Sequence, residues 1–133
     1  MIFGVIVIII GNIVRFIYNL LIPIMMITLG IIAKNGVAER INAFKGYRTK
    51  RSMKNINTWR FANKYCGTLL VKFGIYIFIV SAIFTGISLL FERGVQGMVG
   101  SILIIIQIAI IVISMFLVEK ALKSKFDESG HYK

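Results

Sequence analysis

The sequence is poor in the residues that build catalytic and metal sites. Among its 133 residues there are one cysteine, one histidine and five acidic residues. Cys66 has no second cysteine for an intramolecular disulfide, and with His131 as the single imidazole a metal cage of side chains is not expected. No Ser/His/Asp, Cys/His or paired-carboxylate set is present for nucleophilic or acid–base chemistry. We therefore expect no cofactor and no enzymatic activity.

Charge is also scarce, and where it occurs it is grouped. Charged residues make up 16% of the chain and hydrophobic residues 58%, whereas a soluble domain carries roughly a quarter charged residues. Three long stretches contain no charge, and about 20 apolar residues suffice to cross roughly 30 Å of hydrocarbon. The sequence predicts an all-α integral membrane protein with one domain, residues 1–133, and transmembrane helices at about 7–33, 67–91 and 97–118.

The distribution of basic residues predicts the orientation. Lysine and arginine total 16, and nine of them lie in the loop 34–66, whereas the turn around residues 92–93 holds one. Because short loops rich in Lys and Arg stay on the cytoplasmic side, we expect this loop and the tail 119–133 inside and the N-terminus outside. Anionic lipid is the expected partner of the loop. The start of the chain lacks a basic segment and a small-residue cleavage site, so it should be retained as part of the first span.

Polar residues inside the predicted spans form a first set of candidates. At 1.5 Å of rise per residue, one polar side chain from each span lies within about 3 Å of the midplane. Lipid penalises such residues, so they should face other helices or a water-filled recess, as packing hydrogen bonds or as a binding or conducting layer. Arg15 could snorkel outward, bind carbonyl groups or contact water, and Pro23 predicts a kink. The candidates are Asn12, Arg15, Asn19, Ser81 and Gln107.

The basic loop holds a second set of candidates. Ser52 is the predicted N-cap of a cytoplasmic amphipathic helix that lies along the membrane between the first and second spans. Trp59 suits the headgroup level of the bilayer, and Asn63, on the apolar face, needs a hydrogen-bond partner. Arg48, in the turn before this helix, offers a planar set of donors to a carbonyl, a carboxylate or a lipid phosphate.

The loop also resembles a known family. Its spacing matches the signature Asn-x3-Gly-x-Arg-x3-Thr/Ser-x6-Trp-x3-His/Asn-x3-Gly of the SdpI family of small bacterial membrane proteins, and the similarity covers about residues 19 to 90. Many members have His where this chain has Asn63, so a role that needs a titrating imidazole is not expected here. The matching residues are Asn42, Gly46, Arg48, Ser52, Trp59, Asn63 and Gly67.

The resemblance implies a place in the bacterial plasma membrane and a role in immunity. Its best-known member protects the cell from a secreted peptide toxin and, when toxin is present, holds a transcriptional repressor at the membrane. A peptide toxin and a cytoplasmic regulator are therefore the implied partners. An accessory or transport component, in which Arg15 and the polar layer line a path between several copies, is the alternative. The signature can also be read as purely structural, and direct nucleic-acid binding is not expected because topology explains the positive charge.

Overall fold

The computed structural model describes residues 1–37, 39–41 and 43–133 as three long helices. They are α1 (Ile2–Ile32), followed by a π-helical turn η1 (Ala33–Val37), α2 (Ile56–Ser88) and α3 (Arg93–Lys125). The segments Ile2–Val37, Ile56–Ser88 and Arg93–Lys125 are each long and apolar enough to cross a membrane. The predicted all-helical architecture, with three helices able to span a membrane, is confirmed.

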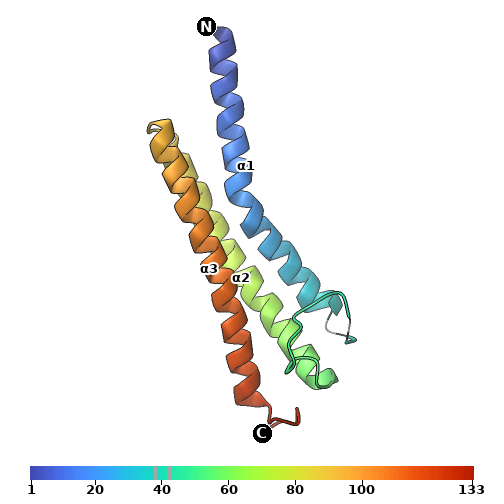
Figure 1. Ribbon diagram of the computed structural model, residues 1–133. Helices are drawn as coiled ribbons and strands as arrows, with labels where there is room; N and C mark the ends of the chain where they lie inside the picture. Colours follow the sequence, from blue (N-terminus) through green and yellow to red (C-terminus); the bar gives the residue numbers. More distant parts are fainter. Residues whose placement is uncertain (38, 42) are drawn as a thin grey trace.

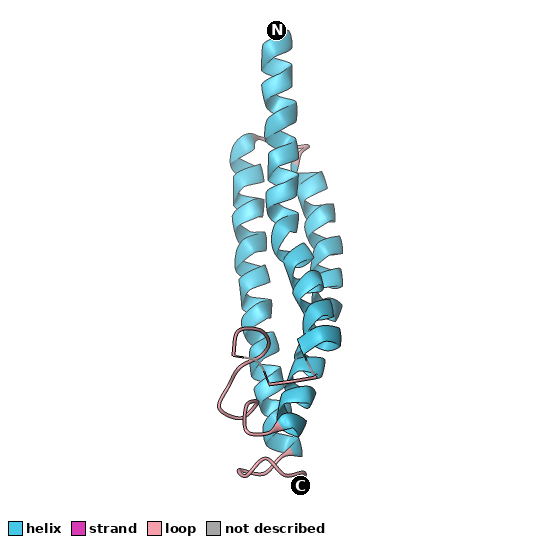
Figure 2. Ribbon diagram, turned by 90° about the vertical axis from the view of Figure 1, so that its right-hand side faces the viewer, coloured by secondary structure: helices cyan, strands magenta, loops and turns pink. Residues whose placement is uncertain are grey.

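The helices are arranged as an antiparallel pair with a third helix against it. Figures 1 and 2 show α2 and α3 running side by side, while α1 packs along α2 and its N-terminal turns project beyond the α2–α3 connection. We call the end that holds residues 34–55 and the C-terminus the loop end, and the end that holds residues 89–92 the turn end. All candidate residues of the signature that the structure describes lie at the loop end.

The helix that carries the second predicted span begins about three turns before that span. Residues 56–66 are the first turns of α2 itself, so no separate amphipathic helix precedes the span. The N-cap is Asn55 rather than Ser52: the Asn55 side chain accepts hydrogen bonds from the backbone N–H groups of Asn57 and Thr58, each at 3.0 Å. The hydroxyl of Thr58 in turn accepts from the Asn55 N–H at 3.1 Å. This reciprocal box fixes the start of the helix, and no break follows before Ser88.

Two glycines of α2, Gly67 and Gly74, allow α1 and α2 to approach closely. A Cβ placed on Gly67 would lie 2.5 Å from the carbonyl oxygen of Gly30 and 2.7 Å from the backbone nitrogen of Lys34. Gly74, two turns further along α2, meets Ile27 of α1 in the same way, with a Cβ 2.8 Å from its side chain. Close approach at small residues is the usual way in which membrane helices gain packing energy. This crossing positions the end of α1 beside the start of α2.

Candidate functional site

The centre of the loop end is a buried pair on α2, Trp59 and Asn63. Both side chains have no solvent exposure. The indole Nε1 of Trp59 donates to the carbonyl oxygen of Val37 at 2.9 Å, so this side chain packs inside the protein, and its depth at the lipid headgroups stays a prediction. Asn63 accepts a hydrogen bond from the backbone N–H of Tyr47 at 2.7 Å and donates to the Trp59 carbonyl at 3.0 Å. The pair therefore holds the loop against the beginning of α2.

Gly46 is required where the loop passes over this pair. Its φ is +107°, a conformation that residues with a side chain rarely adopt. A Cβ at this position would also lie 2.6 Å from the Val37 side chain and would overlap the Asn63 amide. The absence of a side chain lets the next residue, Tyr47, present its N–H to Asn63.

Ser52 closes the turn that follows. Its hydroxyl donates to the Tyr47 carbonyl at 2.8 Å and accepts from the Thr49 N–H at the same distance. The Thr49 hydroxyl accepts from the Ser52 N–H at 3.2 Å. Ser52 is fully buried, so it stabilises the turn from within instead of capping a helix. The segment 46–52 is thus held by side chains at both of its ends.

Glu119 of α3 ties the same turn to the third helix. Its carboxylate accepts hydrogen bonds from the hydroxyls of Tyr47 and Thr49, each at 3.3 Å, and pairs with the Arg51 Nε at 3.2 Å. Burial and the adjacent Glu119 charge raise the pKa of the Tyr47 phenol to about 12. Glu119 could not be found from the sequence, because nothing in the local pattern connects an acid on the last helix with a loop about 70 positions earlier.

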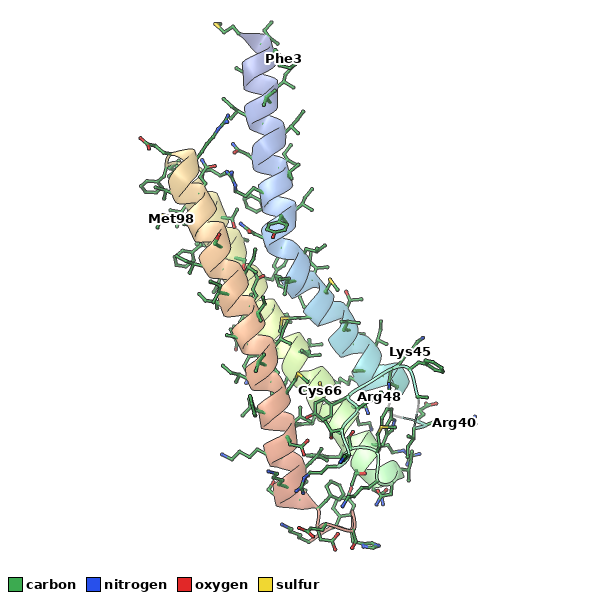
Figure 3. The ribbon with its side chains drawn as sticks, in the orientation of Figure 1. Phe3, Arg40, Lys45, Arg48, Cys66 and Met98 are labelled. Atoms are coloured by element: carbon green, nitrogen blue, oxygen red, sulfur yellow. The ribbon has the colours of Figure 1, made fainter. Side chains whose placement is uncertain are left out.

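The Arg48 side chain is exposed, although it lies between the buried Tyr47 and the partly buried Thr49. Within the described parts of the chain no hydrogen bond or ion pair is found for its guanidinium, whereas the nearby Arg51 is paired with Glu119. Figure 3 shows Arg48, Lys45 and Arg40 around the loop end. Asn42, the first residue of the signature, lies outside the described residues.

The polar layer predicted between the spans is assembled by the structure. Gln107 of α3 donates through Nε2 to the Ser81 hydroxyl and to the backbone carbonyl of Asn19, both at 2.9 Å. Pro23, four residues after Asn19, has no N–H to offer that carbonyl, so Gln107 replaces the missing helical hydrogen bond. Figure 1 shows α1 changing direction along its length, as Pro23 predicts. Asn19 also donates to the Thr85 hydroxyl at 3.0 Å, a partner that the sequence analysis missed.

Two acceptors in this layer have no partner among the described residues. They are Asn19 Oδ1 and Gln107 Oε1, and both side chains are at most 1% exposed. The Asn19 oxygen faces Gly100, where a Cβ would lie 3.3 Å away. A buried acceptor without a donor costs free energy, so this layer is less stable than a fully paired one.

Arg15 and Asn12 lie at the turn end, apart from the layer. The Arg15 Nη1 donates to the Oε1 of Gln96, and the Gln96 Nε2 donates to the Phe91 carbonyl at 2.9 Å. Arg15 is expected from the sequence to snorkel outward, to bind carbonyl groups or to contact water. In the structure it binds a carbonyl group, that of the Gln96 side-chain amide. Arg15 and Asn12 also line a pocket of about 380 Å³ that includes Glu92. Within the described residues no three His, Cys, Asp or Glu side chains are placed to share a metal ion.

Comparison with known proteins agrees with the signature at the loop end. The SdpI/YfhL protein family matches residues 39–118, which include α2 and most of α3 as well as the loop. The uncharacterized protein YfhL of Bacillus subtilis (strain 168) is 37% identical over 110 residues, which cover 80% of this chain and 86% of that protein. No solved structure matches the chain. The protein is therefore a membrane protein of the SdpI/YfhL family.

Proposed function

We propose that this protein gives a bacterium resistance to a secreted antimicrobial peptide, as an immunity and signalling protein of the plasma membrane. The family to which the chain belongs supports the proposal. The observation that carries it is the contrast within the loop: Arg48 is exposed without a partner among the described residues, while the turn around it is fixed by buried side chains. An arginine that served only to keep the loop on the cytoplasmic side would not need a turn fixed by buried side chains.

Tyr47, the residue before Arg48, is fixed by three of its groups. Its N–H donates to Asn63, its carbonyl accepts from Ser52, and its hydroxyl lies within hydrogen-bond distance of the Met115 carbonyl and of Glu119. A group fixed before binding loses less conformational freedom when its partner arrives. The planar guanidinium then offers paired donors to a carboxylate or to the carbonyl groups of a peptide. Because the loop is expected on the cytoplasmic side, we assign Arg48 the role of contacting a cytoplasmic regulator, while the spans or the outer face engage the toxin.

The proposal is tested by survival of cells that carry altered proteins. A strain without this gene is exposed to concentrated culture medium from its parent and is complemented with wild type, Arg48→Lys or Arg40→Lys at matched protein levels. Arg40→Lys is the control because Arg40 is an exposed arginine of the same loop. We expect Arg40→Lys to protect like wild type and Arg48→Lys to protect roughly tenfold less, because Lys keeps the charge and loses the paired donors. Equal protection by the two variants would remove Arg48 from the site.

A second candidate function, that of an accessory or transport component, is favoured by the unpartnered acceptors Asn19 Oδ1 and Gln107 Oε1. Such acceptors suit a polar path completed by other copies or subunits. In the same experiment this function predicts that loss of the gene leaves survival unchanged. Killing of the deletion strain and rescue by wild type would favour immunity.

A further inference from the structure

A second concave site lies at the loop end, between the last turn of the α1 segment and the first turns of α2. It is a pocket of about 510 Å³ lined by Lys34, Asn35, Glu39, Arg60 and Lys64. The volume is within the range of small-ligand sites, about 300–1,000 Å³. The signature residues do not line it, so it is separate from the Arg48 turn.

The helix crossing builds this pocket. Because Gly30 and Gly67 lack side chains, α1 and α2 touch there, and the Lys34 backbone nitrogen would lie 2.7 Å from a Cβ on Gly67. Lys34 belongs to the π-helical turn η1 and therefore lies at this contact. On α2, Arg60 and Lys64 are four residues apart and so share one face of the helix. Three cationic side chains therefore converge from two elements.

The positive charge of this pocket is only partly offset by its one carboxylate, that of Glu39. The side chains of Lys34, Arg60 and Lys64 are exposed, and within the described residues the ion pairs are Arg51 with Glu119 and His131 with Asp127, neither of which is in the pocket. Glu39 supplies the single carboxylate of the lining. The pocket thus carries an excess of two positive charges.

The position of Lys34 along the first span places the pocket at the membrane surface. Lys34 directly follows the charge-free stretch 16–33 of the first span, so it lies within one turn of the edge of the hydrocarbon. The headgroup region begins there and is about 5–7 Å thick on each side of the core. Basic pockets between helices at this level suit phospholipid headgroups, whereas a cytosolic anion has no need for a site at the bilayer edge.

We propose that this pocket binds the phosphate of a singly charged phospholipid whose headgroup carries hydroxyl groups, as in phosphatidylglycerol. Lys34, Arg60 and Lys64 donate to the phosphate oxygens through charge-assisted hydrogen bonds. The Glu39 carboxylate accepts hydrogen bonds from the headgroup hydroxyls, and it repels a second phosphate. The excess of positive charge favours an anionic headgroup over a zwitterionic one. This site is independent of the proposed function.

The test is lipid binding to the full-length protein in a neutral detergent at 0.15 M salt, followed by native mass spectrometry. The probes are phosphatidylglycerol, phosphatidylcholine and glycerol 3-phosphate. Wild type should retain phosphatidylglycerol in preference to phosphatidylcholine, and Arg60→Gln with Lys64→Gln should bind it roughly tenfold more weakly. The matched control is Lys45→Gln with Lys50→Gln, which removes the same charge from exposed loop residues outside the pocket. Because salt screens charges beyond about 8 Å, the control should bind within about twofold of wild type.

Three results would overturn the proposal. Equal weakening by the two double variants would show diffuse attraction instead of a site, and equal retention of phosphatidylcholine would remove the selectivity for an anionic headgroup. Displacement of the lipid by glycerol 3-phosphate at equal concentration would make a free phosphate the ligand. Circular dichroism of each variant provides the folding control. Helix content equal to wild type is expected, since the altered side chains are exposed and unpaired within the described residues.

Discussion

Replacing Asn63 by alanine removes the side chain that joins the loop to α2. The backbone N–H of Tyr47 then loses its acceptor at 2.7 Å in a position closed to water. The other hydrogen bond of Asn63, to the Trp59 carbonyl, costs less to lose, because that carbonyl still accepts the helical N–H four residues on. One buried donor left without a partner costs about 1–3 kcal/mol. We therefore expect Asn63→Ala to lower the free energy of unfolding by that amount.

The protein contains its own reporter for this change. Trp59 is the single tryptophan, is fully buried, and lies one turn before Asn63 on α2. Unfolding in mixed micelles with increasing dodecyl sulfate, followed by Trp59 fluorescence, measures the loss of stability where it arises. Asn57→Ala is the control, because Asn57 is exposed on the first turn of the same helix and should shift stability by less than about 0.5 kcal/mol. A loss for Asn63→Ala no larger than that of the control would refute the anchoring of the loop on Asn63.

Two further changes test the helix crossing and the turn. Gly67→Ala places a Cβ 2.5 Å from the Gly30 carbonyl oxygen and should destabilise the protein by about 1–3 kcal/mol in the same unfolding experiment. The control Gly86→Ala has nothing within 4 Å of its Cβ and should not destabilise it. Equal stability of the two variants would contradict the helix contact. The pKa of Tyr47 is raised to about 12 by burial and by Glu119, so the folded state keeps a proton that the unfolded state releases near pH 10. Stability should therefore fall between pH 10 and 12, by about 1–2 kcal/mol once screening by solvent at the phenol is allowed for. Tyr47→Phe should lack this part of the fall, and parallel curves of unfolding free energy against pH would contradict the assignment.

The parts of the fold that depend on composition could be predicted from the sequence. Three charge-free stretches predict three spans, because a charge in the hydrocarbon is costly whatever its neighbours are. The polar layer followed from helical rise alone, since residues at similar depth on adjacent helices have few other partners. The freed carbonyl of Asn19 was also foreseeable from Pro23, although its acceptance of a hydrogen bond from Gln107 was not.

The parts that depend on tertiary contact could not be predicted. Ser52 and Asn55 are both suitable N-caps, and the choice between them depends on the Tyr47 carbonyl that occupies the Ser52 hydroxyl. Trp59 is a residue type that often lies at the lipid headgroups. The Val37 carbonyl gives its indole N–H a buried hydrogen-bond partner, so burial of the ring inside the protein is favourable. Both contacts arise because the loop returns to cover the start of α2, which no local pattern shows.

The position of Glu119 on the last helix sets an order of assembly. Its three partners in the loop, Tyr47, Thr49 and Arg51, leave the ribosome well before it does. At bacterial rates of about 5–20 residues per second, the delay between Arg51 and Glu119 is roughly 3 to 14 s. During that interval the turn can settle on Asn63 but cannot be joined to α3. A chain that stalls before the third span therefore lacks the contacts that Glu119 gives to the loop.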